Sequence, residues 1–333
     1  MIEERNWAAY NTASCEEKSR FVALLADLCG GVVQPPRLPG AGRSRLPLSD
    51  MLFAAAYKVY VGFSARRFTC DLKEAFLDGL IGNTPHFNSV NRYIANPTLT
   101  EPLKALVSLS SLPLKAVETD FAVDSSGFST CRFVRWFNKK YGKEVDYRQW
   151  VKCHLMSGVQ TKIVSGVEVS GWTAHDTNYF LPLVQSTAEH FQVGNVLADK
   201  AYLSRKNLKA VEEIGATPFI PFKSNTLEPT EEEEPIWARM YYYFMYNRLT
   251  FMEHYHQRSS IESAYLMIKA KFGDSVRSKS DTGQINEALC KVLAHNICVL
   301  ALAMHDLGIE PDFGSKANCG SEIPFEPQLP GFG

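Results

Sequence analysis

The chain lacks the features of a membrane or secreted protein. No uninterrupted apolar run approaches the roughly eighteen residues that cross a bilayer. The acidic start from Met1 to Glu4 is not followed by the apolar stretch of a signal peptide. The eight cysteines include no CxxC pair, which favours reduced, mostly buried thiols. We therefore expect a cytoplasmic protein without membrane partners.

The chain also lacks an excess of charge of one sign. It has 35 Lys and Arg against 36 Asp and Glu, for a net charge of −1, whereas nucleic-acid-binding domains are usually strongly basic. The charges are nevertheless segregated, with seven Lys and Arg from Arg132 to Lys152 and an acidic run from Glu231 to Glu234. Local patches are therefore better guides to partners than the total.

What the chain does contain is a polar stripe on a predicted helix that runs from Tyr255 to Lys269. No Pro or Gly interrupts this segment, and Gly273 follows its end, as is typical of a helix. Steps of 3, 4 and 7 residues return to nearly the same side of a helix, although a solvated face with ion pairs has the same pattern. The stripe consists of Tyr255, Arg258, Glu262 and Lys269, and the residues expected to pack inward are Ile261, Leu266 and Ile268.

Two aspartates follow short apolar runs that are typical of buried strands. Asp124 comes directly after residues 121–123, and Asp199 comes directly after residues 196–198. Each has a structural alternative, because Asp124 can cap a strand end and Asp199 can cap the next helix. Asp120 is a rival first acid, since it shares the strand parity of Asp124. Two carboxylates at strand ends and one on the later helix can converge on a divalent metal pair.

Together these residues resemble the signature of a known family. The spacing Tyr-2-Arg-3-Glu-6-Lys is similar to that of bacterial insertion-sequence transposases of the DDE type, and Asp124 and Asp199 stand where that family has its first two acids. The resemblance covers roughly residues 46–307 and is strongest around the three acids. It implies a DNA transposase that cleaves DNA and joins strands at the terminal inverted repeats of an insertion sequence.

The resemblance also implies the chemistry of the site. Asp124, Asp199 and Glu262 are the expected catalytic residues and the ligands of two Mg²⁺ ions, for which Mn²⁺ can substitute. A pair of such ions about 3.5–4 Å apart activates the nucleophile and stabilises both the attacking and the leaving oxygen, and Mg²⁺ prefers carboxylates. Asp124 is expected to bridge both ions, with Asp199 on the ion that activates the nucleophile and Glu262 on the other.

The expected partner is double-stranded DNA, both the inverted-repeat ends and the target, bound by a homodimer associated with the nucleoid. Arg258 is expected to hold a phosphate through its planar fork. Lys269 is expected to do the same, or to be a solvated side chain. The basic aromatic stretch 132–148 suits a loop that grips DNA ends. The candidate DNA-binding residues are Tyr255, Arg258, Lys269, Arg135, Lys139, Lys140, Arg92 and Arg277.

The order of predicted elements after residue 113 is that of a ribonuclease-H-like domain. Strands are expected at 121–123, 150–156, 161–169, 196–198 and 217–221, with helices at 175–190 and 203–214. In that layout the first and fourth strands are neighbours, so Asp124 and Asp199 lie side by side, and Glu262 arrives from a helix packed over them. The predicted fold class is α/β, a mixed five-stranded sheet flanked by helices and preceded by a small all-helical domain.

The predicted domain organisation has four parts. An N-terminal helix and linker (1–45) precede a helical, helix-turn-helix-like DNA-binding domain (46–112). The catalytic domain (113–309) contains a modest insertion at about 222–254, and a loose tail (310–333) follows. Within the second part, the helix at 87–95 has a polar face that includes Arg92 and suits DNA reading, although an ordinary helical bundle is the alternative.

Two other functions remain open. A metal-dependent nuclease on the same fold would cut DNA without joining strands. A domesticated DNA-binding protein would have a decayed site, and the intact acids and Tyr-Arg-Glu-Lys spacing argue against decay. Loss of Mg²⁺-dependent cleavage with DNA binding retained in Asp199→Ala would indicate an enzyme.

Overall fold

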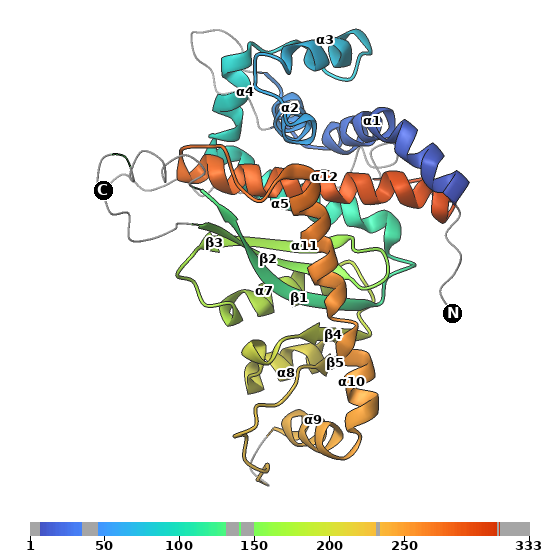
Figure 1. The fold of residues 1–333 in the computed structure, drawn as a ribbon, viewed down its shortest axis with the longest axis vertical. Coiled ribbons are helices and arrows are strands. Elements are labelled where there is room, and N and C mark those ends of the chain that lie inside the picture. Colours follow the sequence, from blue (N-terminus) through green and yellow to red (C-terminus); the bar gives the residue numbers. More distant parts are fainter. Residues whose placement is uncertain are drawn as a thin grey trace.

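The computed structural model describes residues 7–34, 46–130, 140, 150–230, 234–311 and 313. A group of helices precedes a single sheet, and further helices follow it (Figure 1). The α-helices of the first group are α1 (Trp7–Gly30), α2 (Leu48–Val61), α3 (Thr69–Leu77), α4 (Phe87–Ile94) and α5 (Thr100–Ser111).

Five strands form a mixed sheet in the order β3-β2-β1-β4-β5. β1 runs antiparallel to β2 and parallel to β4, so the first and fourth strands are neighbours. This arrangement confirms the predicted α/β, ribonuclease-H-like fold class. The strands are β1 (Asp120–Ser129), β2 (Trp150–Gly158), β3 (Val164–Gly171), β4 (Asn195–Ala198) and β5 (Thr217–Phe219).

The first strand is longer than predicted, and this changes the position of Asp124. β1 pairs with β4 only as far as Val123 opposite Ala198. It continues to pair with β2 from Asp124 to Ser129, because that antiparallel ladder extends beyond the end of β4. Asp124 therefore lies within a strand, at the point where one of its two neighbours stops, and the prediction that it ends a strand was wrong.

The helices after β3 cover the sheet and extend the molecule beyond β5 (Figure 1). In the segment 222–254 no strand is present among the described residues, and an aromatic cluster holds two helices there. The Phe222 ring lies 4.9 Å from Trp237, and Phe244 lies 5.0 Å from Phe251. These helices are α7 (Thr177–Ala188), α8 (Arg205–Glu213), α9 (Pro235–Tyr246), α10 (Arg248–His256), α11 (Ser259–Phe272) and α12 (Asp281–Asp306).

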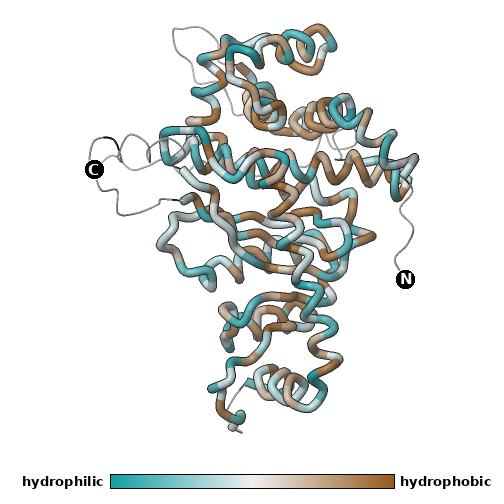
Figure 2. The backbone as a smooth tube through the Cα atoms, viewed as in Figure 1, coloured by the Kyte–Doolittle hydropathy of each residue, from teal (hydrophilic) through white to brown (hydrophobic). Residues whose placement is uncertain are grey.

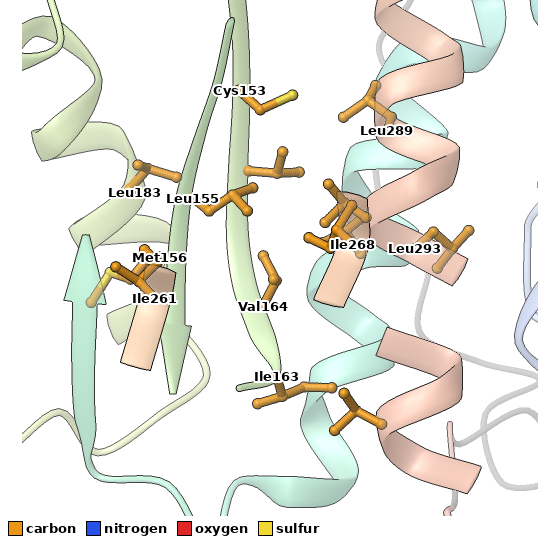
Figure 3. Close-up of a cluster of buried hydrophobic side chains, with 14 of the residues drawn as sticks. Cys153, Leu155, Met156, Ile163, Val164, Leu183, Ile261, Ile268, Leu289 and Leu293 are labelled. Carbon is orange, nitrogen blue, oxygen red and sulfur yellow. The ribbon is translucent and has the colours of Figure 1, made fainter. Parts of the chain in front are cut away.

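The long helix α12 is the centre of the core and contacts α1, α2, α5, α11 and β3. Figure 3 shows Leu289 and Leu293 of this helix beside Ile268 of α11, and Figure 2 shows hydrophobic residues along α12 and the strands beneath it. By length and composition α12 could cross a membrane, but 78% of its most apolar window is buried inside the fold. It therefore has the burial of a core helix.

A buried amide on α12 links the helices to the sheet. Asn296 donates hydrogen bonds to the carbonyls of Val107 on α5 and Val164 on β3, at 3.1 and 2.7 Å. Its carbonyl oxygen accepts from the Val164 amide at 2.9 Å. Because a buried polar group is costly when unpaired, these bonds fix the position of α12 against both neighbours.

The predicted single helix from Tyr255 to Lys269 is divided into two. α10 ends at His256 and α11 begins at Ser259. Amides in the junction bond three residues back rather than four, as in Arg258 to Tyr255 at 2.9 Å, which is the tighter pattern of a 3₁₀ turn. The prediction for Leu266 was also wrong, since its exposed fraction is 69%, whereas Ile261 and Ile268 are fully buried as expected.

Candidate active site

The sheet brings two of the predicted acids together. Val123 of β1 and Ala198 of β4 are the last paired residues of a parallel ladder, and Asp124 and Asp199 are the next residue on each chain. Parallel neighbours that stop at the same level place their following side chains at one edge. The two aspartates therefore lie side by side, and the charge of Asp199 acts on the Asp124 carboxyl.

Arg258 brings the third acid to the same place. Its Nη1 donates to Oδ2 of Asp124 at 3.0 Å, and its Nη2 donates to Oε1 of Glu262 at 2.7 Å. The Tyr255 ring centre lies 6.0 Å from the same guanidinium. Arg258 therefore joins Tyr255, Glu262 and Asp124 into one group, and it is an ion-pair partner of two acids in this structure rather than a side chain facing solvent.

Tyr265 fixes α11 onto the sheet beneath this group. Its hydroxyl lies 3.0 Å from the carbonyl oxygen of Asp124 and 2.8 Å from that of Cys153, so it bridges β1 and β2. Tyr265 was not among the residues predicted from the sequence. The signal was available, because it shares the buried face with Ile261 and Ile268 at steps of four and three.

The environment of Asp124 opposes its negative charge. Burial raises the pKa of this carboxyl, and the nearby Asp199 adds to the increase. The amide of Ser125, 2.8 Å from Oδ1, and the Arg258 guanidinium act in the opposite direction. A carboxylate that is partly desolvated and next to a like charge is stabilised by any cation placed beside it.

A buried tyrosine that was not predicted from the sequence, Tyr202, also interacts electrostatically with Asp124 and Asp199. The Tyr202 hydroxyl is buried and has no hydrogen-bond partner in the described part of the chain. Burial raises its pKa, and the charges of Asp176 and Asp124 contribute. The nearby Ser125 side chain acts in the opposite direction, and the charge of Asp199 adds to the increase.

Lys269 lies further along α11 and contacts the strand. Its Nζ donates to Oγ of Ser126 at 2.6 Å, and it lies 5.7 Å from the Phe128 ring centre. The ammonium is only partly exposed and is bound to β1, so Lys269 is not a freely solvated side chain. Its expected contact with a phosphate stays a prediction.

The remaining predicted DNA-binding residues are not gathered around the acids. Arg92 is exposed in the last turn of α4, and Arg277 donates to the carbonyl of Gly62 at 2.6 Å. Lys140 is exposed. Arg135 and Lys139 lie outside the described residues.

The donor set suits a divalent cation by its chemistry, although no cluster of three or more acidic, His or Cys side chains with metal-binding geometry occurs in the ranges that the structure covers. Carboxylate oxygens are the ligands that Mg²⁺ prefers. The guanidinium of Arg258 now lies between Asp124 and Glu262, where it neutralises them. The type and charge of these acids therefore suit a metal cation. In this structure the Arg258 guanidinium provides the positive charge between them.

Comparison with known proteins agrees with this geometry. Residues 115–297 match the family described as the transposase DDE domain, which is more than half of the 333 residues. No curated protein matches the chain. The matched region begins just before β1 and ends within α12, so it includes all three acids. The chain belongs to the transposase DDE domain family.

Proposed function

We propose that the protein is a DNA transposase that cleaves DNA at the terminal inverted repeats of an insertion sequence and joins the freed 3′ end to target DNA. Membership of the family makes it a transposase-type nuclease that acts on DNA. One observation supports cleavage and joining by this site. Asp124 of the central strand β1 and Glu262 of α11 both pair with the guanidinium of Arg258, which also interacts with Asp199.

In this proposal Asp124, Asp199 and Glu262 hold two Mg²⁺ ions. When bound, these ions supply an activated oxygen nucleophile and neutralise charge on the phosphate. Tyr265 holds the backbone of Asp124, and Ser125 orients its carboxylate. When metal ions neutralise the acids, the guanidinium of Arg258 becomes available to donate hydrogen bonds to phosphate oxygens. Its planar pair of N–H donors suits such oxygens.

Arg92 and the other exposed polar residues of α4 are the proposed contacts to the terminal repeats. α4 has a helix cap at His86, whose ring nitrogen accepts from the Asn88 amide at 3.3 Å. Two subunits bound to the two ends would form the homodimer on DNA. The domain boundaries predicted above belong to the same proposal.

The test compares two acids at opposite ends of the ladder between β1 and β4, Asp199 and Asp120. A plasmid that carries the gene with its native flanking DNA is incubated with Mg²⁺ and each variant. Asp199→Asn should lose cleavage while binding DNA as the native protein does, because the amide keeps the shape and removes the charge. Asp120→Asn is the matched control, since its carboxylate accepts from Asn195 at 2.9 Å at the opposite end of the ladder.

The products separate the proposed functions. Joined donor–target molecules from the native protein indicate a transposase, and cut DNA without joined products indicates a nuclease. Binding without cleavage indicates a DNA-binding protein with an inactive site. Full cleavage by Asp199→Asn, or its loss in Asp120→Asn alone, would overturn the assignment of the acids.

A further inference from the structure

A cavity of about 180 Å³ lies between the C-terminal ends of α2 and α11 and the side of α12. This is several times the roughly 30 Å³ that one water molecule takes up in the liquid. Its lining includes the four cations Lys58, Lys271, Arg277 and Lys291, and the single acid Glu287. It is separate from the three acids described above.

The one acid in the lining is already satisfied by other groups. The carboxylate of Glu287 accepts from the backbone amides of Arg277 and Ser278, each at 2.8 Å, and from the Ser278 hydroxyl at 2.7 Å. It therefore holds the chain that leads from α11 into α12. Its charge also acts on Lys58 and Lys291, but one carboxylate offsets only part of the positive charge of four cations.

Two of the cations have partners elsewhere. Lys271 forms an ion pair with Glu17 of α1. Lys291 is almost fully buried, and its ammonium donates to the carbonyls of Gly273 and Ser275, each at 2.8 Å. Lys291 forms no ion pair with a carboxylate in the described ranges. Its buried charge therefore contributes a positive potential to the cavity.

The other two cations, Lys58 and Arg277, form no direct ion pair among the described residues. Lys58 forms no ion pair with any carboxylate that the structure describes, and burial lowers its pKa. Arg277 is exposed and uses one nitrogen on the carbonyl of Gly62. That carbonyl follows the end of α2, which Gly62 closes with a φ of 72°. Because Arg277 already donates to a carbonyl at the C-terminal end of α2, Lys58 is not needed to cap this helix.

The cavity is aligned with the acids along one helix. α11 carries Glu262 near its start and Phe272, a cavity residue, at its end. At 1.5 Å per residue these positions are about 15 Å apart along the axis, which is the rise of about four nucleotides in one strand of a duplex. Lys269, bound to Ser126, lies between them.

We propose that this cavity binds a backbone phosphate of the DNA whose scissile bond lies at the three acids, with Lys58 and Arg277 as its ligands. The inference rests on the proposed function, since it requires DNA to follow α11. A phosphate site recognises the charge of the DNA backbone and not its base sequence. It would therefore position the DNA strand relative to the acids.

The test uses a fluorescent random-sequence duplex in EDTA, between about 50 and 200 mM salt. Lys58→Met removes the charge and keeps the apolar stem, and we expect it to weaken binding roughly tenfold and to reduce the salt slope by about one. Lys58→Arg keeps the charge and should bind as the native chain does. Lys206→Met, at an exposed position of α8, is the control for a general loss of positive charge.

Arg277→Gln should reproduce the effect of Lys58→Met, which covers the case in which Lys58→Met does not fold. If both charge-removing variants fold, keep the native salt slope and bind as tightly as Lys206→Met, the cavity is not a phosphate site, while DNA binding by the native chain leaves the proposed function standing. If inorganic phosphate binds there and DNA does not compete, the DNA assignment is overturned. If the native chain binds no DNA, both proposals fail together.

Discussion

At the scale of single residues, Arg258 links Asp124 of the sheet to Glu262 of α11. Its side chain is 16% exposed, and it holds a partly buried acid, Asp124, at 26% exposure, together with the exposed Glu262. A charge that remains in such a position without its partner is costly. Arg258 therefore acts as a cation within the group of acids, in addition to the role in phosphate binding proposed above.

We predict that Arg258→Ala lowers the free energy of unfolding by about 1–3 kcal/mol in EDTA. Added Mg²⁺ should restore stability more in this variant than in the native protein, because it replaces the lost positive charge. Urea unfolding with and without Mg²⁺ measures both effects. The control is Arg239→Ala, whose ion pair with Glu212 is largely exposed and should contribute less than about 1 kcal/mol. Equal losses in the two variants would contradict this role for Arg258.

Two tyrosines show what could not be predicted at this scale. Tyr202 and Tyr265 reach the acids from residues that no charge pattern marks, because their contacts depend on the packing of η3 (Lys200–Tyr202) and α11 against the sheet. That Asp124 and Asp199 lie side by side could be predicted, since each follows an apolar run that is visible in the sequence. The ion pairs of Arg258 could not, because spacing indicates a shared face and not a partner.

At the scale of elements, the turn between β2 and β3 depends on a buried acid. Glu118 is fully buried, and its carboxylate accepts from the amide of Gln160 at 3.2 Å and from Thr161. Gly158 lies directly against it, and a Cβ placed there would be 2.3 Å from the carboxyl carbon. The glycine is therefore required by a close approach to Glu118.

We predict that Gly158→Ala lowers the free energy of unfolding by at least about 2 kcal/mol, because either Glu118 or the strand must move. Gly171→Ala, at the end of β3, is the matched control, since a Cβ there meets nothing within 4 Å. Its stability should change by less than about 0.5 kcal/mol. Thermal or urea unfolding of both variants provides the comparison. Similar losses of stability in the two would show that the close approach to Glu118 does not require a glycine at position 158.

The elements themselves were largely predictable from periodicity, and the exceptions have physical causes. The five strands appeared where apolar runs and turn residues placed them. β1 was longer because Ser125 to Ser129 pair with β2, and a polar sequence does not indicate such pairing. The break at Gln257 could not be predicted, since neither Gly nor Pro marks it and the backbone there stays close to helical values.

At the scale of the whole molecule, buried histidines connect stability to pH. Burial lowers the pKa of both His154 and His295 to about 4, from about 6.5 in the unfolded chain. Asp176 and Lys152 face His154 and act in opposite directions. Because the unfolded chain binds these protons first, the contribution of each neutral histidine is complete above pH 6.5 and is lost as the pH falls towards 4.

We predict that the free energy of unfolding decreases by about 2 kcal/mol per buried histidine between pH 7 and pH 5. His295→Gln should reduce this dependence, since Gln has no titrating group and can still donate to the carbonyl of Lys162, now 2.9 Å from Nε2. His190→Gln, at an exposed position, should leave it unchanged. Urea unfolding at several pH values tests the difference in slope, and parallel curves for the native protein and His295→Gln would contradict it.

The position of α12 has a consequence for the spacing between the proposed DNA contacts of α4 and the acids. Asn286 of α12 donates to the carbonyls of Ile94 and Asn96, each at 2.9 Å, and thereby binds the end of α4. The same helix packs against α11, which carries Glu262. The proposed DNA-reading helix and the proposed catalytic acids are therefore connected through one helix, α12, which would keep the distance between them constant. A terminal repeat whose spacing departs from that distance would be recognised and left uncut.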